Sequence, residues 1–207
     1  RSHPAIFNDD VISKGLERYG VPADEAHDYI HSTCVEITPV ASSNVWVASP
    51  YTNMAQLLLN TMQEEHSDFD ALLQALLARL DQVIEKNFQT QNEFRRIRAE
   101  NSLNPLLSCF VDDCLAHGLD IEKGGARYNW IMPSFVGMAN LVDSLYALRT
   151  LVYERRELTV SELCACLAND FVGHEALLAR VNALPKYGNN VDEVDELFSG
   201  LIDHIVK

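Results

Sequence analysis

A thiol and a carboxyl group stand two residues apart in the stretch 32–39, which reads Ser-Thr-Cys-Val-Glu-Ile-Thr-Pro. The stretch is rich in threonine, valine and isoleucine, a composition typical of extended backbone, in which alternate side chains point to the same face. Cys34 and Glu36 are therefore expected to face one space, with their Cα atoms roughly 6.5 Å apart. A small molecule in that space can touch both groups at once.

The neighbouring carboxyl group indicates which chemistry suits the thiol of Cys34. A nucleophilic thiolate needs a histidine or a positive environment, and a carboxylate provides the opposite. A neutral thiol can instead lose its hydrogen atom, and the thiyl radical takes hydrogen from carbon while the carboxylate removes a substrate proton. The residues alone leave a second interpretation open, a buried structural thiol, which the residue type by itself favours.

Short elements are expected to position this stretch. A helix is predicted over 8–19, capped by Asn8 or Asp9 and closed by Gly20, and a second helix over 22–29 is opened by Pro22. One extended segment over 30–38 follows and ends at Pro39. Residues 40–52 are expected to form a long ordered loop with a short strand at 45–47.

The remainder of the chain is predicted to be mainly helical. Helices are expected from 53 onward, over 105–118, over 137–154 and in the terminal segment to 207. The helix over 68–98 carries apolar residues at helical spacing, namely Leu72, Leu76, Leu80, Val83 and Ile84. Capping boxes are predicted at Thr159 with Glu162 and at Asn190 with Glu193.

Gly124 and Gly125 predict a tight turn with a close backbone approach, before a strand over 126–131. The chain thus has few extended segments, and three short strands hardly make a sheet. The sequence therefore predicts a helix-rich part of a larger α/β architecture.

The composition is that of a globular protein, with 207 residues of which 47% are hydrophobic and 22% charged. The net charge of −14 opposes binding to nucleic acid or to anionic lipid, so neither a nucleic-acid role nor a membrane role is expected. No apolar run approaches the ~20 residues needed to cross a bilayer, and the N-terminus shows no signal-peptide pattern. The expected compartment is the cytoplasm.

No metal site is expected from the histidines and cysteines. His27 and His31 have the spacing of two helical ligands, but the extended segment that begins near Ile30 breaks that geometry. The cysteines have neither a disulfide framework nor a zinc spacing, and apart from Cys34 we expect them to be reduced and packed in the core: Cys109, Cys114, Cys164 and Cys166.

The Cys34-Val35-Glu36 motif resembles the active-cysteine motif of the glycyl radical enzymes, the pyruvate formate-lyase-like superfamily. A Cys-x-Glu motif alone is weakly specific, but several ordered matches along the chain are strongly specific. The resemblance covers nearly all of this chain and a minor part of the family's chain. The further matching stretches are Ala5 to Asp9, Gly124 to Asn129, Val136 to Asn140 with Asp143 to Leu145, and Pro185 to Asn189.

The resemblance implies a fold and a source of the radical. The family fold is a ten-stranded α/β barrel of two half-barrels wrapped by helices, and residues 1–207 would form a helix-rich part of it, the active-cysteine half. In the family, a glycine near the C-terminus stores a radical that a separate radical S-adenosylmethionine activating enzyme installs. The Arg-Val-x-Gly-Tyr motif of that glycine is absent here, so the glycyl radical domain would be missing and this chain would bind no cofactor.

The resemblance also implies residue roles and partners. The radical would pass to Cys34, which abstracts hydrogen from a small-molecule substrate, and Glu36 would act as base on the substrate hydroxyl. Tyr51 falls where some eliminases place a pocket tyrosine. Family members with Cys-x-Glu act on diols, choline, hydroxyproline or sulfonates, and the expected partners are the activating enzyme and further copies of the chain in a homo-oligomer.

Three departures from the family pattern leave the substrate open. Val35 stands where pyruvate formate-lyase has a second cysteine, which argues against pyruvate. Thr33 replaces the glycine that most eliminases have before the cysteine, and Ile37 replaces a proline that many have after the glutamate.

The first functional hypothesis is a radical dehydratase or related eliminase. The second is a catalytically silent fragment or helical interaction module, and the third is a formate acetyltransferase-like carbon–carbon lyase or an arylacetate decarboxylase. A fragment cut from a barrel should also expose apolar surface and self-associate.

Overall fold

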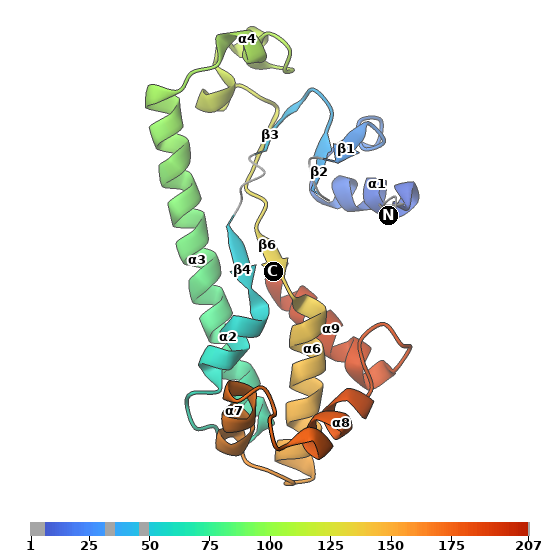
Figure 1. Ribbon diagram of the computed structural model, residues 1–207. Helices are drawn as coiled ribbons and strands as arrows, with labels where there is room; N and C mark the ends of the chain where they lie inside the picture. Colours follow the sequence, from blue (N-terminus) through green and yellow to red (C-terminus); the bar gives the residue numbers. More distant parts are fainter. Residues whose placement is uncertain (1–6, 32–35, 46–49, 207) are drawn as a thin grey trace. The chain divides into compact units, whose positions relative to one another are not determined.

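The computed structural model describes residues 7–31, 36–45 and 50–206, and the chain divides into two compact units (Figure 1). The first unit comprises residues 1–50 and 87–133, and the second comprises residues 51–86 and 134–207. The long helix α3 (Phe69–Asn101) contributes its first half to the second unit and its second half to the first. Each unit has its own buried apolar residues.

The first unit begins with α1 (Asp9–Arg18), which is capped as predicted because the side chain of Asn8 accepts a hydrogen bond from the Val11 amide. The helix predicted over 22–29 is wrong. Residues 23–27 form turns, held by the amides of Glu25 and Ala26 on the Pro22 carbonyl. A helix of so few residues is marginal without tertiary support. In the turns that form instead, Ala26 is completely buried.

An antiparallel hairpin replaces the single extended segment predicted over 30–38, so that prediction is wrong. Strand β1 (Tyr29–His31) pairs with β2 (Ile37–Pro39), with Tyr29 opposite Pro39 and His31 opposite Ile37. The pairing gives the backbone groups of both strands the partners that one isolated strand would lack. The prediction that Cys34 and Glu36 face one space involves Cys34, which lies in residues 32–35 outside the described part of the chain.

Two further strand pairs are parallel. In the first unit β3 (Ser43–Val45) pairs with β5 (Tyr128–Trp130), and in the second unit β4 (Tyr51–Asn53) pairs with β6 (Ser134–Val136). The strand predicted over 126–131 thus forms within narrower limits, and of the strand predicted at 45–47 only Val45, the last residue of β3, lies within the described residues. Each described strand has three residues and each sheet two strands, which confirms the prediction of a helix-rich α/β chain with few strands.

The glycine turn before β5 is confirmed. Gly124 has φ +80°, and a Cβ atom on Gly125 would lie 2.3 Å from the carbonyl oxygen of Leu119. The backbone therefore approaches so closely that only glycine fits at 125. The turn follows the short 3₁₀ helix η1 (Ile121–Lys123).

The helix predicted over 105–118 is broken in two, as α4 (Pro105–Ser108) and α5 (Cys114–His117). Asp113 adopts the left-handed conformation with φ +73°, which ends the helical path. The amide of Asp112 donates a hydrogen bond to the Ala41 carbonyl at 2.7 Å. A tertiary bond therefore replaces a helical one at this position.

The second unit is built on one large apolar core. It joins α2 (Met54–Thr61), the first half of α3, α6 (Met138–Ala147) and α9 (Asp192–Ile205). Leu72, Leu76 and Leu80 are fully buried, as their helical spacing predicts, and Val83 and Ile84 pack against them in part. Cys166 on α7 (Val160–Ala168) is buried and Cys164 is half-buried. In the first unit Cys114 is buried as predicted, but the prediction of a core position for Cys109 is wrong, because this residue directly follows α4 and is itself exposed.

The helix ends in this unit bear out one predicted capping box and contradict the other. Thr159 and Glu162 cap α7 reciprocally, as predicted. The second box is wrong, because Asn190 has φ +58° and α9 begins after Val191 without a side-chain cap. Glu193 instead accepts a hydrogen bond from the hydroxyl of Tyr146 at 3.2 Å.

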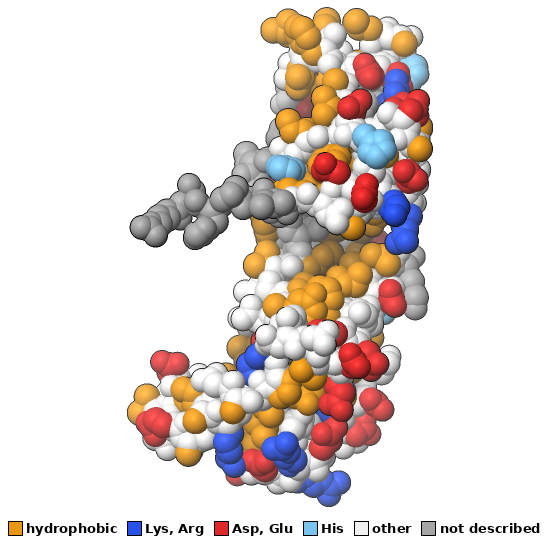
Figure 2. Space-filling model, turned by 90° about the vertical axis from the view of Figure 1, so that its right-hand side faces the viewer, with side chains coloured by type: hydrophobic (Ala, Val, Ile, Leu, Met, Phe, Trp, Pro, Cys, Tyr) orange, Lys and Arg blue, Asp and Glu red, His pale blue; other side chains and the backbone are white. Residues whose placement is uncertain are grey.

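The helix predicted over 137–154 starts as α6 and continues as a π-helix, η2 (Leu148–Glu154), before α7 and α8 (Glu175–Ala183) follow. No helix in the described parts of the chain is both long enough and apolar enough to cross a membrane. Exposed apolar side chains gather around α4 and α5, at the upper end of Figure 2. They include Leu106 (74% exposed), Phe110 (71%) and Leu115 (70%).

Candidate active site

The hairpin of β1 and β2 carries the residues that the sequence singles out for chemistry. Cys34 lies in the stretch 32–35, outside the described residues, and Glu36 is the last residue before β2. His31 and Ile37 are paired across the hairpin, so residues 32–36 form a five-residue connection. Two Cα–Cα steps of 3.8 Å separate Cys34 from Glu36, which limits their Cα atoms to at most ~7.6 Å apart.

Glu36 is buried, with 9% of its surface exposed. Among the described residues it is the one charged residue that is buried as a whole, and it is not without an interaction partner. Burying a carboxyl group is costly unless it is partnered, so its position is specified by the fold. A shielded carboxyl group beside a thiol is suited to take a proton from a bound molecule.

Helix α1 holds the first strand of the hairpin. The hydroxyl of Tyr29 on β1 donates a short hydrogen bond to the carboxylate of Asp9, and this bond raises the pKa of Tyr29. The hydroxyl of Ser13, itself buried on α1, lies 2.9 Å from Nδ1 of His27. The ring of His31, on β1, lies 4.1 Å from the ring of Phe7.

Sequence reasoning missed two residues at the base of the hairpin, Arg127 and Tyr128. The guanidinium of Arg127 donates two hydrogen bonds of 3.0 Å to Asp113 and one of 2.7 Å to Glu25. The hydroxyl of Tyr128 donates to the other oxygen of Glu25 at 2.9 Å. Both residues stand in the stretch Gly124 to Asn129, which matched the family motif without a role attached.

These contacts shift the titration of the groups involved. The hydrogen bond from Arg127 lowers the pKa of the Asp113 carboxyl group, and the Asp113 and Glu25 carboxylates raise the pKa of Arg127. Burial, followed by the bond to Glu25, raises the pKa of Tyr128. At neutral pH the Asp113 carboxyl group is therefore ionised, the Arg127 guanidinium is charged and the Tyr128 hydroxyl is neutral.

Tyr51 belongs to the second unit, whereas the hairpin belongs to the first. It begins β4 in the second unit and is 61% exposed, while its neighbour Thr52 is buried. The described part of the first unit therefore contains Glu36 and not Tyr51. A substrate-binding role for Tyr51 stays a prediction.

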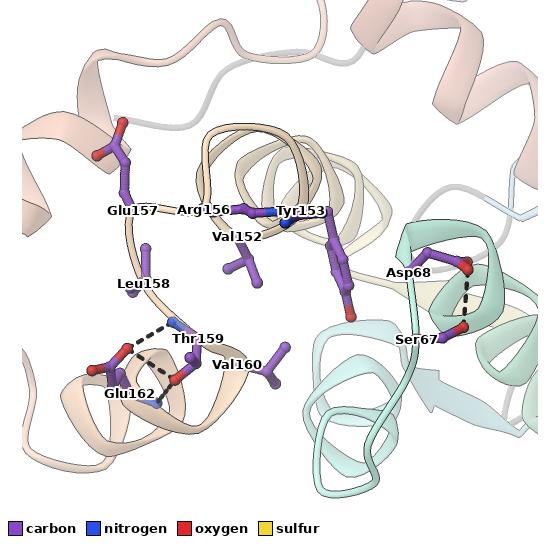
Figure 3. Close-up of a pocket in the computed structure, with 10 residues that line it drawn as sticks. All are labelled: Ser67, Asp68, Val152, Tyr153, Arg156, Glu157, Leu158, Thr159, Val160 and Glu162. Carbon is purple, nitrogen blue, oxygen red and sulfur yellow. Dashed lines mark hydrogen bonds between the residues drawn. The ribbon is translucent and has the colours of Figure 1, made fainter.

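A recess of about 490 Å³ lies in the second unit (Figure 3). Its three carboxyl groups already have partners: Asp68 accepts from the Ala71 amide at 2.8 Å, Glu162 caps α7, and Glu157 pairs with Arg180 at 2.7 Å. Its lining contains no cysteine, and among the described residues no group of three or more metal-binding side chains occurs. The recess thus offers no second place for thiol chemistry.

Comparison with known proteins matches the whole chain to one family. A family model described as pyruvate formate lyase-like covers residues 1–207. The chain is 31% identical to the (2S)-3-sulfopropanediol dehydratase of Klebsiella oxytoca, over 97% of this chain and 27% of that protein. The chain therefore spans about a quarter of that relative's length.

Solved structures show the same relationship in three dimensions. The glycerol-bound form of the B12-independent glycerol dehydratase from Clostridium butyricum matches with a TM-score of 0.88 and 31% identity. The hydroxyproline dehydratase from Clostridioides difficile, solved with trans-4-hydroxy-L-proline bound, matches with a TM-score of 0.89 and 27% identity. Each match covers 98% of this chain and 28% of the solved chain.

Proposed function

Because this chain belongs to the pyruvate formate lyase-like family of glycyl radical enzymes, we propose that it supplies the active-cysteine segment of a radical lyase. The lyase would remove a leaving group from a small hydroxylated molecule. The observation that carries the proposal is the burial of Glu36 at the end of the five-residue connection that contains Cys34. Residues 1–207 would form part of the family's barrel, and activity would require the remainder of a protein of the relatives' length.

The two groups divide the reaction between a hydrogen atom and a proton. The sulfur radical of Cys34 takes a hydrogen atom from the carbon that bears the hydroxyl group, which restores the thiol and leaves a carbon radical. Glu36 takes the hydroxyl proton. Hydroxide then departs from the adjacent carbon with its bonding electron pair and takes the proton held by Glu36, so that water leaves and a carbonyl forms. The resulting carbon radical takes a hydrogen atom back from Cys34.

The radical itself comes from outside the described residues in this proposal. A glycyl radical, installed by a radical S-adenosylmethionine activating enzyme, supplies the one-electron chemistry. The residues of this chain hold the hydrogen-atom carrier and the base within reach of one small molecule. We also propose that Tyr51 lines the substrate pocket.

The substrate class is proposed from what the relatives' names state. The relatives bind or act on glycerol, trans-4-hydroxy-L-proline and (2S)-3-sulfopropanediol, each of which carries a hydroxyl group. Glycerol and (2S)-3-sulfopropanediol carry hydroxyl groups on two adjacent carbons, as the reaction above requires, and form the first panel for an assay of the full-length protein after anaerobic activation. In trans-4-hydroxy-L-proline the one hydroxyl group would itself be the leaving group, so this compound tests a variant of the reaction. We expect the turned-over member to lose water.

Substitution of the two groups in the activated full-length protein tests the proposal. Cys34→Ala should abolish turnover, and Glu36→Gln should lower kcat by about 10²–10⁴-fold because a general base is lost. Cys109→Ala is the matched control, since Cys109 is an exposed thiol of the same unit and should leave turnover unchanged. Retained turnover in Cys34→Ala would refute the proposal.

The silent-fragment hypothesis applies to the 207-residue chain by itself. It is favoured by the absence of the Arg-Val-x-Gly-Tyr motif from the sequence. Electron paramagnetic resonance after anaerobic incubation with an activating enzyme should show no glycyl doublet on this chain alone. A doublet on the isolated chain would contradict this hypothesis.

A further inference from the structure

We infer that Arg127 and Tyr128 are positioning residues that fix the hairpin carrying residues 32–36. The inference rests on the proposed function, because the hairpin matters only if Cys34 and Glu36 act together. Neither residue is part of the reacting pair. Their side chains and backbone hold the two ends of the hairpin, on the side opposite the connection.

The first end is held by side chains, through Glu25. Glu25 stands in the turns that lead into β1, and both of its carboxylate oxygens are occupied. Arg127 donates to one at 2.7 Å and Tyr128 to the other at 2.9 Å. The entry into β1 is thereby fixed in position and in orientation, since two donors from different directions define the plane of the carboxylate.

The second end is held by the backbone, just beyond β2. The amide of Tyr128 donates to the Ser42 carbonyl at 3.0 Å, and the amide of Asp112 donates to the Ala41 carbonyl at 2.7 Å. Asp113, the next residue, is the two-bond partner of Arg127. Residues 112–113 and 127–128 therefore tie the chain before β1 and after β2 into one arrangement.

Apolar packing around these bonds is small. Only Leu16, Val21 and Ala26 are buried in the cluster at the hairpin, with the side chains of Tyr29, Ile37, Tyr128 and Trp130 packed partly against it. The rings of Tyr128 and Trp130 lie 5.3 Å apart. Arg95 in turn donates to the carbonyls of Asn129 and Trp130, which attaches β5 to α3. The position of the hairpin therefore depends mainly on hydrogen bonds and ion pairs.

A stability role and a positioning role predict different results for Arg127. The side chains of Arg127, Glu25 and Asp113 are 35%, 32% and 29% exposed, and ion pairs of that exposure add little to stability. A small shift of the hairpin, in contrast, moves Cys34 and Glu36 together relative to a bound molecule. A displacement of about 1 Å can cost about 10²-fold in rate.

The test uses the activated full-length protein and the panel substrate with the highest turnover. Arg127→Met should lower kcat about tenfold to a hundredfold, at unchanged glycyl radical yield in electron paramagnetic resonance. Tyr128→Phe, which removes one bond to Glu25, should lower kcat by about twofold to tenfold. Arg127→Lys should restore part of the loss, because the charge remains but the two-bond contact with Asp113 does not.

Hydrogen–deuterium exchange of the peptide over 29–39 provides the readout that does not depend on turnover. Exchange should speed up in Arg127→Met and in Tyr128→Phe, while a peptide from 69–86 in the second unit stays unchanged. Arg96→Met is the matched control, since Arg96 also pairs with two carboxylates, Glu93 and Glu100, on the exposed surface of α3. It should alter neither readout.

Two outcomes would overturn the inference. Unchanged exchange over 29–39 in Tyr128→Phe would show that the hairpin does not depend on this contact, even if Arg127→Met failed to fold. Normal kcat in Arg127→Met would show that the contact has no part in positioning. Failure of the proposed function would give a different result. Cys34→Ala would then keep its turnover, while exchange over 29–39 would still be faster in Arg127→Met and Tyr128→Phe.

Discussion

The two units of the chain differ in the interactions that stabilise each of them internally. Among the described residues, the second unit has one cluster of sixteen buried apolar residues, drawn from segments between Met54 and Leu201, and a smaller one of three. The first unit has two clusters of three buried residues each, and its hairpin is tied by hydrogen bonds and ion pairs. Apolar burial is strong but has no direction, whereas hydrogen bonds fix angles. The unit that we propose to carry the chemistry is therefore the one in which hydrogen bonds fix the orientation of the backbone and side chains.

The largest expected effect tests the apolar half of this comparison. Leu76 is fully buried in the core of the second unit, so Leu76→Ala should lower the free energy of unfolding by about 2–5 kcal/mol. Urea unfolding followed by circular dichroism measures the change. Leu106→Ala is the control, because Leu106 is 74% exposed and its loss should change stability by less than about 0.5 kcal/mol. Equal effects of the two substitutions would contradict the assignment of this core.

The next effect tests whether backbone geometry governs the first unit. Gly125→Ala would place a Cβ atom 2.3 Å from the Leu119 carbonyl oxygen, so the turn must shift, at a cost of about 1–3 kcal/mol. The loss should appear in urea unfolding and as faster hydrogen exchange in a peptide over 119–128.

Gly15→Ala is the matched control for that substitution. Gly15 lies within α1 and has open space around it, so alanine should stabilise the helix by up to about 1 kcal/mol. If Gly125→Ala proved as harmless as Gly15→Ala, the close approach would not exist in solution.

The sequence predicted the second unit better than the first, for a physical reason. The buried positions Leu72, Leu76 and Leu80 follow the helical period, which depends on neighbours along the chain. The hairpin of β1 and β2 was predicted as one strand, because residues 30–38 contain no Gly or Asn turn signal. The chain before β1 is held by a contact between Glu25 and Arg127, which are 102 residues apart in the sequence, and local patterns do not indicate such contacts.

In the candidate site, too, local features could be predicted from the sequence and long-range contacts could not. A motif placed Cys34 and Glu36 near each other, and the chain itself guarantees their closeness. The burial of Glu36 could not be predicted, since its neighbours Val35 and Ile37 give no indication of which residues cover it. Arg127 stands in a stretch that matched the family motif, but no local pattern links it to Asp113 and Glu25, with which it makes three hydrogen bonds.

A smaller effect tests the helix caps of the second unit. Thr159→Ala removes a reciprocal capping box from α7 and should cost about 1 kcal/mol in the free energy of unfolding. Asn190→Gly serves as its counterpart, because Asn190 makes no cap and glycine accepts its φ of +58°. The counterpart should leave the unfolding midpoint almost unchanged. A loss as large as that of Thr159→Ala would indicate a cap at Asn190 after all.

The smallest expected effect is a pH dependence in the first unit. The hydrogen bond from Arg127 lowers the pKa of Asp113 in the folded protein, and the charge of His117 adds to this in smaller measure. A carboxyl group with a lowered folded pKa contributes stability above its unfolded pKa of about 3.9, and that stability is lost as the pH falls through the folded pKa. Asp112 also faces Arg127, at 3.9 Å. Urea midpoints measured from pH 6 down to pH 2 should therefore fall more steeply below about pH 4 in the wild-type protein than in Arg127→Met. Parallel curves for the two proteins would mean that the contact between Arg127 and Asp113 does not form in solution. The statement that polar bonds hold the first unit would then lose its support.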